Sequence, residues 1–302
     1  MDLTTCKLYG IKRKRDIRVL LKINSKKNIS QICNLYKPYI ANKGKKRLIE
    51  PIDSKELKSI QKRIQILLKD IKYDENIFSG IPGKSYIDNG LYHLESKYVV
   101  ALDINKFFPN ISREKVYKFF KNKLMNSSDV AEILTDLCTV NLEKISNLDN
   151  NVLDYLKDNK IHQMKHIPTG SSISCIMSYL SNIDMFNEIS NVAKISGCKV
   201  SIYVDDVVIS SNKMINNEII NKIISIIKRN GYNIQKKKLK KYYSNEFKRV
   251  TGNIISKDGN KLVLPNKIRY RIIKLKNNKH IEKEKKILKL KGYNQLILQI
   301  QK

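Results

Sequence analysis

Apolar residues recur along the chain with two periods, and each period predicts a type of element. In the segment 57–71 they are spaced three or four residues apart, as on the buried face of an amphipathic helix. Asp53, with Glu56 three residues later, predicts a capping box at the start of this helix. Similar spacing predicts helices over 173–197 and 216–231, each ended by a glycine.

Alternation of apolar and polar residues predicts strands elsewhere. The segment "YVVALDI" (98–104) is a short apolar strand that carries Asp103 near its end. Residues 200–210, "VSIYVDDVVIS", alternate on both sides of Asp205-Asp206, which predicts a β-hairpin with this acidic pair at its turn. Residues 249–265 predict two short strands joined at Asp258-Gly259. A strand, helices and a hairpin together predict an α/β (α+β) fold with its acidic residues gathered at one sheet edge.

Composition adds a strong charge imbalance to this picture. The chain has 302 residues, of which 41% are hydrophobic, so it can bury a core. It carries 59 Lys and Arg against 28 Asp and Glu, a formal net charge of +31. This excess predicts a polyanionic partner, nucleic acid before membrane, since no run of about 18 apolar residues is present. A Lys-, Ile- and Asn-rich composition is also typical of an AT-rich genome, which is the alternative explanation for part of the charge.

Cysteine and histidine usage gives little sign of a structural metal or a secreted protein. The five cysteines are an odd number without a C-x-x-C pair, which predicts neither a disulfide framework nor a zinc module. The N-terminus has no apolar signal segment, so we expect a cytoplasmic protein. His162 and His166 are four residues apart and could share a helix face, but without acidic or Cys ligands nearby we expect surface residues.

Three aspartates are associated with predicted strands: Asp103, Asp205 and Asp206. Buried carboxylates repel one another and desolvate at high cost, so they persist where cations compensate them. Three carboxylates that converge from a strand and a hairpin are suited to hold two Mg²⁺ ions about 4 Å apart. The alternative is a structural turn, because adjacent aspartates are common in turns.

Several motifs resemble those of reverse transcriptases, in the order found in that family. "YVDD" (203–206) resembles the Y-x-D-D box, "ALDINKFFPNI" (101–111) the first metal-binding motif, and "IPTGSSIS" (167–174) the template- and nucleotide-contacting motif. "DNGLYH" (88–93) is similar to the N-A-x-x-H segment of bacterial retron reverse transcriptases, and "RVTGNII" (249–255) contains their V-T-G triplet. The chain departs from the family at Thr169 for Gln, Ser174-Cys175 for Ser-Pro and Gly90 for Ala.

The resemblance implies a right-hand polymerase fold. The expected division is an N-terminal extension and fingers (1–95), palm with the first metal-binding motif (96–111), a helical fingers/palm insertion (112–164), palm with the YVDD hairpin (165–247) and an RNA-binding thumb (248–302). We expect no maturase domain after the thumb.

The resemblance also assigns roles to residues of this chain. The metal ligands would be Asp103, Asp205, Asp206 and the backbone carbonyl of Ile104. Phe108 would lie under the incoming sugar and exclude a ribose 2′-OH, with Phe107 beside it in the core. The other nucleotide-binding residues would be Lys46, Arg47, Thr169, Gly170 and Lys238, with Lys236 and Lys237 leaving the register of Lys238 open. The RNA-binding residues would be Asn89, His93, Val250, Thr251, Gly252, Arg269, Tyr270 and Arg271.

The resemblance implies a retron-type RNA-directed DNA polymerase that uses two Mg²⁺ ions and dNTPs. Such an enzyme copies part of a cognate non-coding RNA into branched, RNA-linked DNA (msDNA), primed from an RNA 2′-OH. Retrons of this kind act in bacterial antiphage defence with a separate effector protein, and an oligomer would form through the msDNA or the effector. The alternatives are another bacterial reverse transcriptase, group II intron-like or diversity-generating, and a catalytically idle RNA-binding scaffold.

Overall fold

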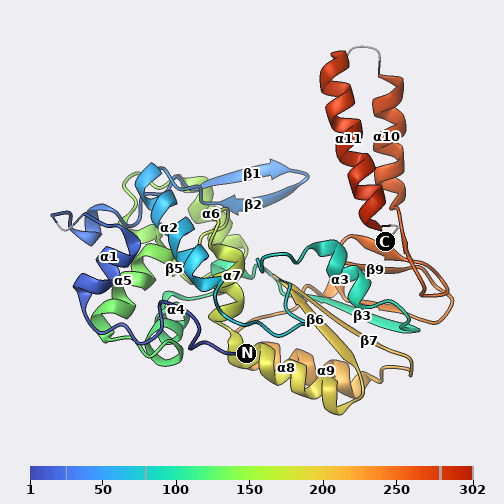
Figure 1. Cartoon of the computed structure of the whole chain (residues 1–302), viewed down its shortest axis with the longest axis horizontal. Helices are drawn as coiled ribbons and strands as arrows, with labels where there is room; N and C mark the ends of the chain where they lie inside the picture. Colours follow the sequence, from blue (N-terminus) through green and yellow to red (C-terminus); the bar gives the residue numbers. More distant parts are fainter. Residues whose placement is uncertain (25, 79, 279–280, 301–302) are drawn as a thin grey trace.

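The structure is a computed structural model that describes residues 1–302 except 25, 79, 279–280 and 301–302. Positions 25 and 79 of the predicted fingers, and 279–280 and 301–302 of the predicted thumb, therefore lie outside the described residues. Figure 1 shows a mixed α/β arrangement: helices from the first half of the chain gather on the left, an antiparallel sheet lies in the right half, and a helical hairpin projects above the sheet. The predicted α/β (α+β) class is confirmed.

The helices are α1 (Lys14–Leu21), α2 (Lys55–Leu68), α3 (Tyr86–Tyr92), α4 (Arg113–Lys118), α5 (Ser128–Cys138), α6 (Asn150–Asp158), α7 (Ser174–Leu180), α8 (Ile183–Ile195), α9 (Asn217–Arg229), α10 (Asn266–Asn277) and α11 (Lys283–Ile300). The strands are β1 (Tyr39–Lys43), β2 (Lys45–Ile49), β3 (Tyr98–Asp103), β4 (Val140–Asn141), β5 (Lys165–His166), β6 (Lys199–Tyr203), β7 (Asp206–Ser211), β8 (Lys240–Tyr242), β9 (Lys248–Val250), β10 (Asn253–Ile255) and β11 (Leu262–Val263).

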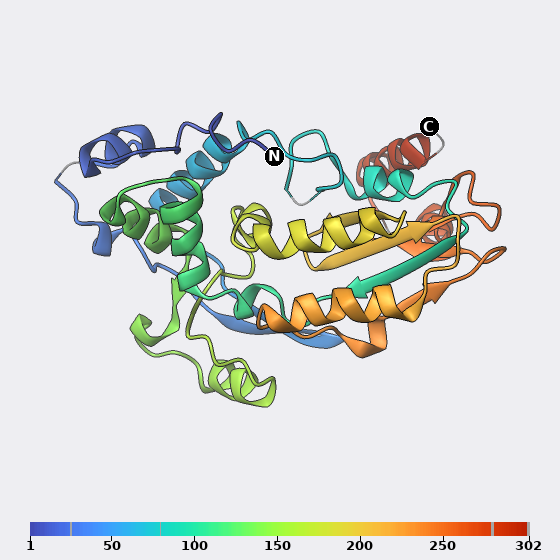
Figure 2. The same ribbon diagram turned by 90° about the horizontal axis from the view of Figure 1, so that it is seen from below.

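The central sheet has the strand order β6-β7-β3-β8, and all its pairs are antiparallel. Helices α8 and α9 cover one face of it, as Figure 2 shows from the side of these helices. Side chains alternate between the two faces of a strand. Val100 and Leu102 of β3 accordingly join the main core with Ile209 of β7, whereas Val99 and Val208 point to the other face and belong to a second core.

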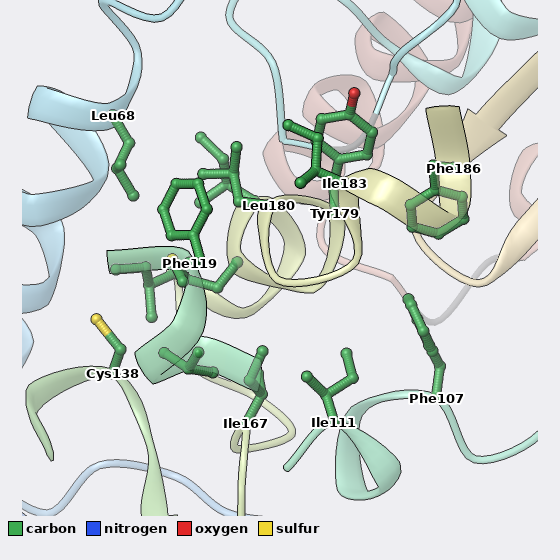
Figure 3. Close-up of a cluster of buried hydrophobic side chains, with 14 of the residues drawn as sticks. Leu68, Phe107, Ile111, Phe119, Cys138, Ile167, Tyr179, Leu180, Ile183 and Phe186 are labelled. Atoms are coloured by element: carbon green, nitrogen blue, oxygen red, sulfur yellow. The ribbon is translucent and has the colours of Figure 1, made fainter. Parts of the chain in front are cut away.

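The main core continues from the sheet helices into the N-terminal half of the molecule. Figure 3 shows four side chains that converge on one buried cluster. They are Leu68 of α2, Phe119 directly after α4, Leu180 of α7 and Phe186 of α8. Phe107 belongs to this cluster as predicted: it is 3% exposed and its ring contacts those of Phe186 and Tyr232. This continuous apolar core fixes the N-terminal helices relative to the sheet.

The second core joins the sheet to the C-terminal part of the chain. Strands β9, β10 and β11 form a three-stranded sheet, where the sequence predicted two strands. The additional turn is Thr251-Gly252, where φ is positive at both positions (+45° and +89°), as in the two-residue hairpin turns that match strand twist. Ile300 of α11 packs with Ile87 and Val99 in this core, so the base of the α10–α11 hairpin is attached to the central sheet.

Two local predictions need correction. Helix α2 is capped by Ser54, whose side chain accepts a hydrogen bond from the Leu57 N–H at 3.2 Å, and not by Asp53. The helix predicted over 173–197 is interrupted between α7 and α8 at 181–182, where the Asn182 amide bonds back to the Ser178 carbonyl. Among the described residues, no helix is long and apolar enough to cross a membrane.

Helix α3 lies unusually close to β10 at Gly90. A Cβ built on Gly90 would lie 2.9 Å from Nδ2 and 3.0 Å from Cβ and Cγ of Asn253. Asn253 is 2% exposed, and its amide donates to the Tyr86 carbonyl, so its side chain has little freedom to move. The replacement of the family's alanine by Gly90 therefore has a steric reason in this chain.

We predict that the effect of Gly90→Ala on stability reverses sign with residue 253. In the wild-type background the new methyl group overlaps Asn253, and the free energy of unfolding should fall by about 1–2 kcal/mol. In an Asn253→Gly background all three contacting atoms are absent, and the better helix propensity of alanine at position 90 should raise the free energy of unfolding by up to about 1 kcal/mol. Urea denaturation of the four proteins measures this double-mutant cycle, and additive effects would contradict the predicted contact.

Candidate active site

The central sheet brings the three predicted acids together. Asp103 at the end of β3 is the register partner of Asp206 at the start of β7, so the two residues are direct cross-strand neighbours. Asp205 lies in the β6–β7 turn, beside Val204, whose φ is +58°. The backbone carbonyl of Asp205 accepts the Ile104 N–H at 2.8 Å, which ties the hairpin turn to the end of β3. The hairpin predicted from the sequence is confirmed, but its turn is Val204-Asp205 and not Asp205-Asp206, because Asp206 already pairs with Tyr203 as the first residue of β7.

The acids lie between two cavities. The first, of about 260 Å³, is lined by Asp103 and Asp205; the second, of about 350 Å³, is lined by Asp103 and Asp206. Asp103 and Lys238 line both. The first cavity also contains Lys45, Lys46, Arg47, Leu48, Ile104, Asn105, Lys106, Phe107, Phe108, Pro109, Tyr155, Thr169 and Gln235. The second also contains Ala101, Leu102, Lys237, Lys240, Tyr242, Arg249, Thr251 and Gly252.

The carboxylates are costly to ionise where they lie. Burial, and then the charges of Asp205 and Asp103, raise the pKa of Asp206 to about 7. Burial and the Asp103 charge likewise raise the pKa of Asp205, against the opposing effect of Lys238 and Arg47. The Lys238 ammonium forms an ion pair with Asp103. Positive charge at this sheet edge therefore stabilises the ionised site.

These groups suit a hard divalent cation by their chemistry. Three carboxylates and the carbonyl of Ile104 supply the oxygen ligands that Mg²⁺ prefers. Among the described residues, however, no three His, Cys, Asp or Glu side chains form a ready-made metal cage. Lys238 already contacts Asp103, so this ion pair must open before a metal ion can bind both oxygens of that carboxylate. The predicted ligand roles of Asp103, Ile104, Asp205 and Asp206 fit the site and stay predictions.

Most of the predicted nucleotide-binding residues meet in the first cavity. Lys46 and Arg47 are exposed on β2, and Phe108 and Thr169 line the same space. Lys238 is the lysine of its run that forms an ion pair with Asp103, and its role at the nucleotide stays a prediction. Gly170 is outside the lining; it has a φ of +108° beside Ile49.

A buried acid–histidine contact positions the loop that contains Thr169. Glu50 is fully buried; its carboxylate accepts hydrogen bonds from the Thr169 N–H (2.8 Å) and from Nε2 of His166 (2.8 Å), and its own N–H donates to the Thr169 carbonyl (2.7 Å). The expectation that His166 is a surface residue on a helix is wrong, because it is fully buried on strand β5. The sequence signal for this contact is Glu50, an acidic residue directly after the cationic strand β2.

Three predicted RNA-binding residues are buried, which excludes direct contact of their side chains with RNA in this structure. His93 is fully buried, and its ring nitrogens bond Ser210 Oγ (2.8 Å) and Ser201 Oγ (2.7 Å) on β7 and β6. Burial lowers the pKa of His93 to about 3, so the ring is neutral. Asn89 is fully buried and donates to Thr251 Oγ1 at 2.6 Å, and Val250 lies in the second core. These residues hold the sheet and the hairpin together.

The other predicted RNA-binding residues lie at the surface in two places. Thr251 and Gly252 line the second cavity beside Asp206. Tyr270 on α10 is 65% exposed, whereas its neighbours Arg269 and Arg271 line two separate cavities of the C-terminal hairpin. The structure therefore does not bring this set together into one site.

Two cavity residues escaped the sequence analysis. Lys106 lies beside Asp103 with a φ of +50°, and its ammonium donates to the Tyr155 hydroxyl and lies 4.6 Å from the centre of that ring. Tyr155 comes from α6, which also packs against β1. The helical segment after the first acid thus supplies a wall of the first cavity, and no local pattern around Tyr155 indicates this.

The fold and the site together define a polymerase-type palm, an antiparallel sheet that is covered by two helices and presents carboxylates at adjacent strand ends. The chain belongs to the reverse transcriptase (RNA-dependent DNA polymerase) family, whose model matches residues 26–270. Members of this family generally use divalent metal ions.

Two relatives of known type resemble the chain. The Retron Se72 reverse transcriptase of Salmonella heidelberg (strain 579083-10) is 30% identical over 225 residues, which are 73% of this chain and 50% of that protein. The Retron Ec48 reverse transcriptase of Escherichia coli is 28% identical over 108 residues, 32% of this chain and 26% of that protein. The chain thus spans half or less of the length of these relatives.

We predict that Asp206→Asn stabilises the metal-free protein increasingly as the pH rises from about 4 to 7. The unfolded Asp206 ionises near 3.8 and the folded one near 7, so ionisation costs the wild-type protein stability over this range and the neutral amide removes the cost. At pH 8 the free energy of unfolding should be higher by about 2–4 kcal/mol.

Urea denaturation in EDTA at several pH values measures this difference, and taking the difference from wild type cancels other titrating groups such as His93. The exposed Asp154→Asn is the matched control and should follow the wild-type profile. If the free energy of unfolding of Asp206→Asn runs parallel to that of wild type across this pH range, the pKa of Asp206 is not raised in the folded protein.

Proposed function

We propose that this chain is a retron-type reverse transcriptase, which copies part of a cognate structured non-coding RNA into DNA. The observation that carries the proposal is the position of Asp103 between two cavities. One is lined by cations and the Phe108 ring, as a deoxynucleoside triphosphate requires. The other is lined by Asp206, Arg249 and the Thr251-Gly252 turn, and suits the end of a primer. The names of the two relatives support the retron assignment.

The residues of the site would act as follows. Lys46 and Arg47 on β2 neutralise the triphosphate, and the Phe108 ring supports the sugar. Asp103, Asp205 and Asp206 hold two Mg²⁺ ions, which when bound lower the pKa of the attacking hydroxyl and stabilise the leaving pyrophosphate. Lys238 is half exposed and lines both cavities, so its ammonium can leave Asp103 and contact the phosphates during the reaction.

The proposal extends to the product and its setting. Synthesis would start from an RNA 2′-OH and yield branched, RNA-linked DNA, in the bacterial cytoplasm, as part of antiphage defence with a separate effector protein. The net charge of +31 supports binding to the RNA and to the msDNA. The proposed division is fingers 1–95 with the helical insertion 112–164, palm 96–111 and 165–247, and thumb 248–302. An oligomer would form through the msDNA or the effector.

The first prediction tests the enzyme against a catalytically idle RNA-binding scaffold. Asp205→Asn or Asp206→Asn should reduce incorporation of labelled dNTP on a primed RNA template by at least a thousandfold, because each removes a charged metal ligand while the protein stays folded. Circular dichroism and RNA binding serve as folding controls. Activity within tenfold of wild type in either variant contradicts the assignment.

The second prediction concerns the choice of sugar. Phe108→Val should admit ribonucleotides by opening space at the 2′ position, so the ratio of kcat/KM for dNTP over rNTP should fall by about tenfold or more. Steady-state incorporation of single nucleotides measures this ratio. Phe186→Leu is the control, because Phe186 is fully buried behind Phe107 and lines neither cavity; it should change stability more than the ratio. An unchanged ratio in active Phe108→Val would leave Phe108 with a packing role alone.

A further inference from the structure

A third cavity, of about 670 Å³, lies between the C-terminal helical hairpin and α3, and it shares no residue with the two cavities at the acids. Both helices of the hairpin and the start of α3 line it. The residues that matter here are Tyr86, Arg271, Lys274, Leu275, Lys289, Gly292, Tyr293 and Leu296. Figure 1 shows the two helices side by side above the central sheet, with α3 near their base.

The lining combines an apolar floor with a cationic rim. Leu275 is buried and Leu296 partly buried, and a tyrosine from each side, Tyr86 and Tyr293, completes the apolar surface. The rim carries the exposed cations Arg271, Lys274 and Lys289, and none of the described residues that line the cavity is Asp or Glu. None of the ion pairs among the described residues involves these three cations.

The folded structure gives no packing or backbone reason for a glycine at position 292. Gly292 lies in the middle of α11, where glycine disfavours the helix relative to alanine. A Cβ at Gly292 would meet no atom within 4 Å, so packing does not require its absence, and Gly292 is not among the glycines with positive φ. The missing side chain leaves space only on the cavity side of the helix. A glycine of this kind is expected where a ligand approaches the helix backbone closely.

We propose that this cavity binds one unpaired nucleotide of an RNA, with the base inside and its phosphates on the cationic rim. Aromatic rings and apolar side chains stack on a base, and guanidinium and ammonium groups pair with phosphate. The bases of a duplex are stacked on one another and offer no free face to the tyrosines, and an acidic peptide would leave the two tyrosines without a flat partner. The inference rests on the proposed function, because it makes the C-terminal hairpin a reader of unpaired positions in the RNA.

The position of Tyr86 links this cavity to the rest of the site. Its backbone carbonyl accepts the Asn253 amide, and Asn253 begins β10 directly after the Thr251-Gly252 turn. A base held against Tyr86 would therefore fix the RNA relative to the turn that lines the second cavity. The tyrosine that the family resemblance assigned to RNA binding is Tyr270, which does not line this cavity.

The test compares two labelled RNA hairpins of equal length, one fully paired and one with a single unpaired adenosine, by fluorescence anisotropy at about 0.15 M salt. Wild type should bind the bulged hairpin about tenfold more tightly than the paired one. Gly292→Leu should bring this ratio close to one, because the leucine fills the cavity. Tyr293→Leu, which keeps an apolar side chain without the ring, should lower the ratio as well.

Asn294→Leu is the matched control, since it puts the same side chain on α11 outside the lining and should keep the wild-type ratio and primer extension. The melting temperature of Gly292→Leu should be at least that of wild type, which excludes unfolding as the cause. The inference is overturned if Gly292→Leu keeps the wild-type ratio of affinities for the bulged and the paired hairpin. It is also overturned if wild type does not prefer the bulged hairpin, and that result would leave a protein partner as the occupant of the cavity. Binding requires no synthesis, so a failure of polymerase activity alone overturns the proposed function and not this site.

Discussion

The proximity of Asp103, Asp205 and Asp206 at one sheet edge is the interaction on which the rest of the molecule depends. Three carboxylates in a partly buried site repel one another and lose solvation, which raises the pKa of Asp206 to about 7. The surrounding elements respond with positive charge: Lys238 contacts Asp103, Arg47 lies near Asp205, and Arg249 near Asp206. These cations also line the cavities through which anionic substrates would approach.

Buried polar contacts, more than apolar ones, place the loops around this site. His93 joins α3 to β6 and β7, Glu50 and His166 hold the loop of Thr169, and Asn89 bonds the Thr251 turn. A buried polar group that loses its partner costs more free energy than an apolar contact of similar size, so such contacts specify one arrangement. This accounts for the burial of Asn89, His93 and Val250, which belong to the two segments that resemble retron motifs and do not face RNA.

The positive charge has a different role in each region. Around the acids it compensates buried carboxylates and faces the nucleotide cavity. Among the described residues of the C-terminal hairpin, no cation forms an ion pair, and three of them surround an apolar cavity. This arrangement lowers folding stability by self-repulsion and is suited to a polyanion. The hairpin is attached to the sheet through Leu296 and Ile300 in the second core, so a ligand on it would be held at a defined distance from the acids.

The sequence by itself determined the elements of the site and their order. Strand periodicity located Asp103 and the hairpin of Asp205 and Asp206, helical periodicity located α2 and α9, and the motifs identified the family. These features are local, because side-chain period and turn chemistry depend on neighbours in the chain. The separate roles of Phe107 and Phe108 came from the family motif, and in the structure both line the first cavity, although Phe107 is almost fully buried.

Only the tertiary structure decided which residues face which partner. The contacts that the sequence did not indicate join segments more than 45 residues apart. They are those of the buried His93, Asn89 and His166, that of Gly90 with Asn253, and that of Tyr155 with Lys106 in the first cavity. The open side of Gly292 depends on how α10, α11 and α3 meet. Such contacts are set by the packing of whole elements on two cores, and the local pattern around any one of these residues does not contain that information.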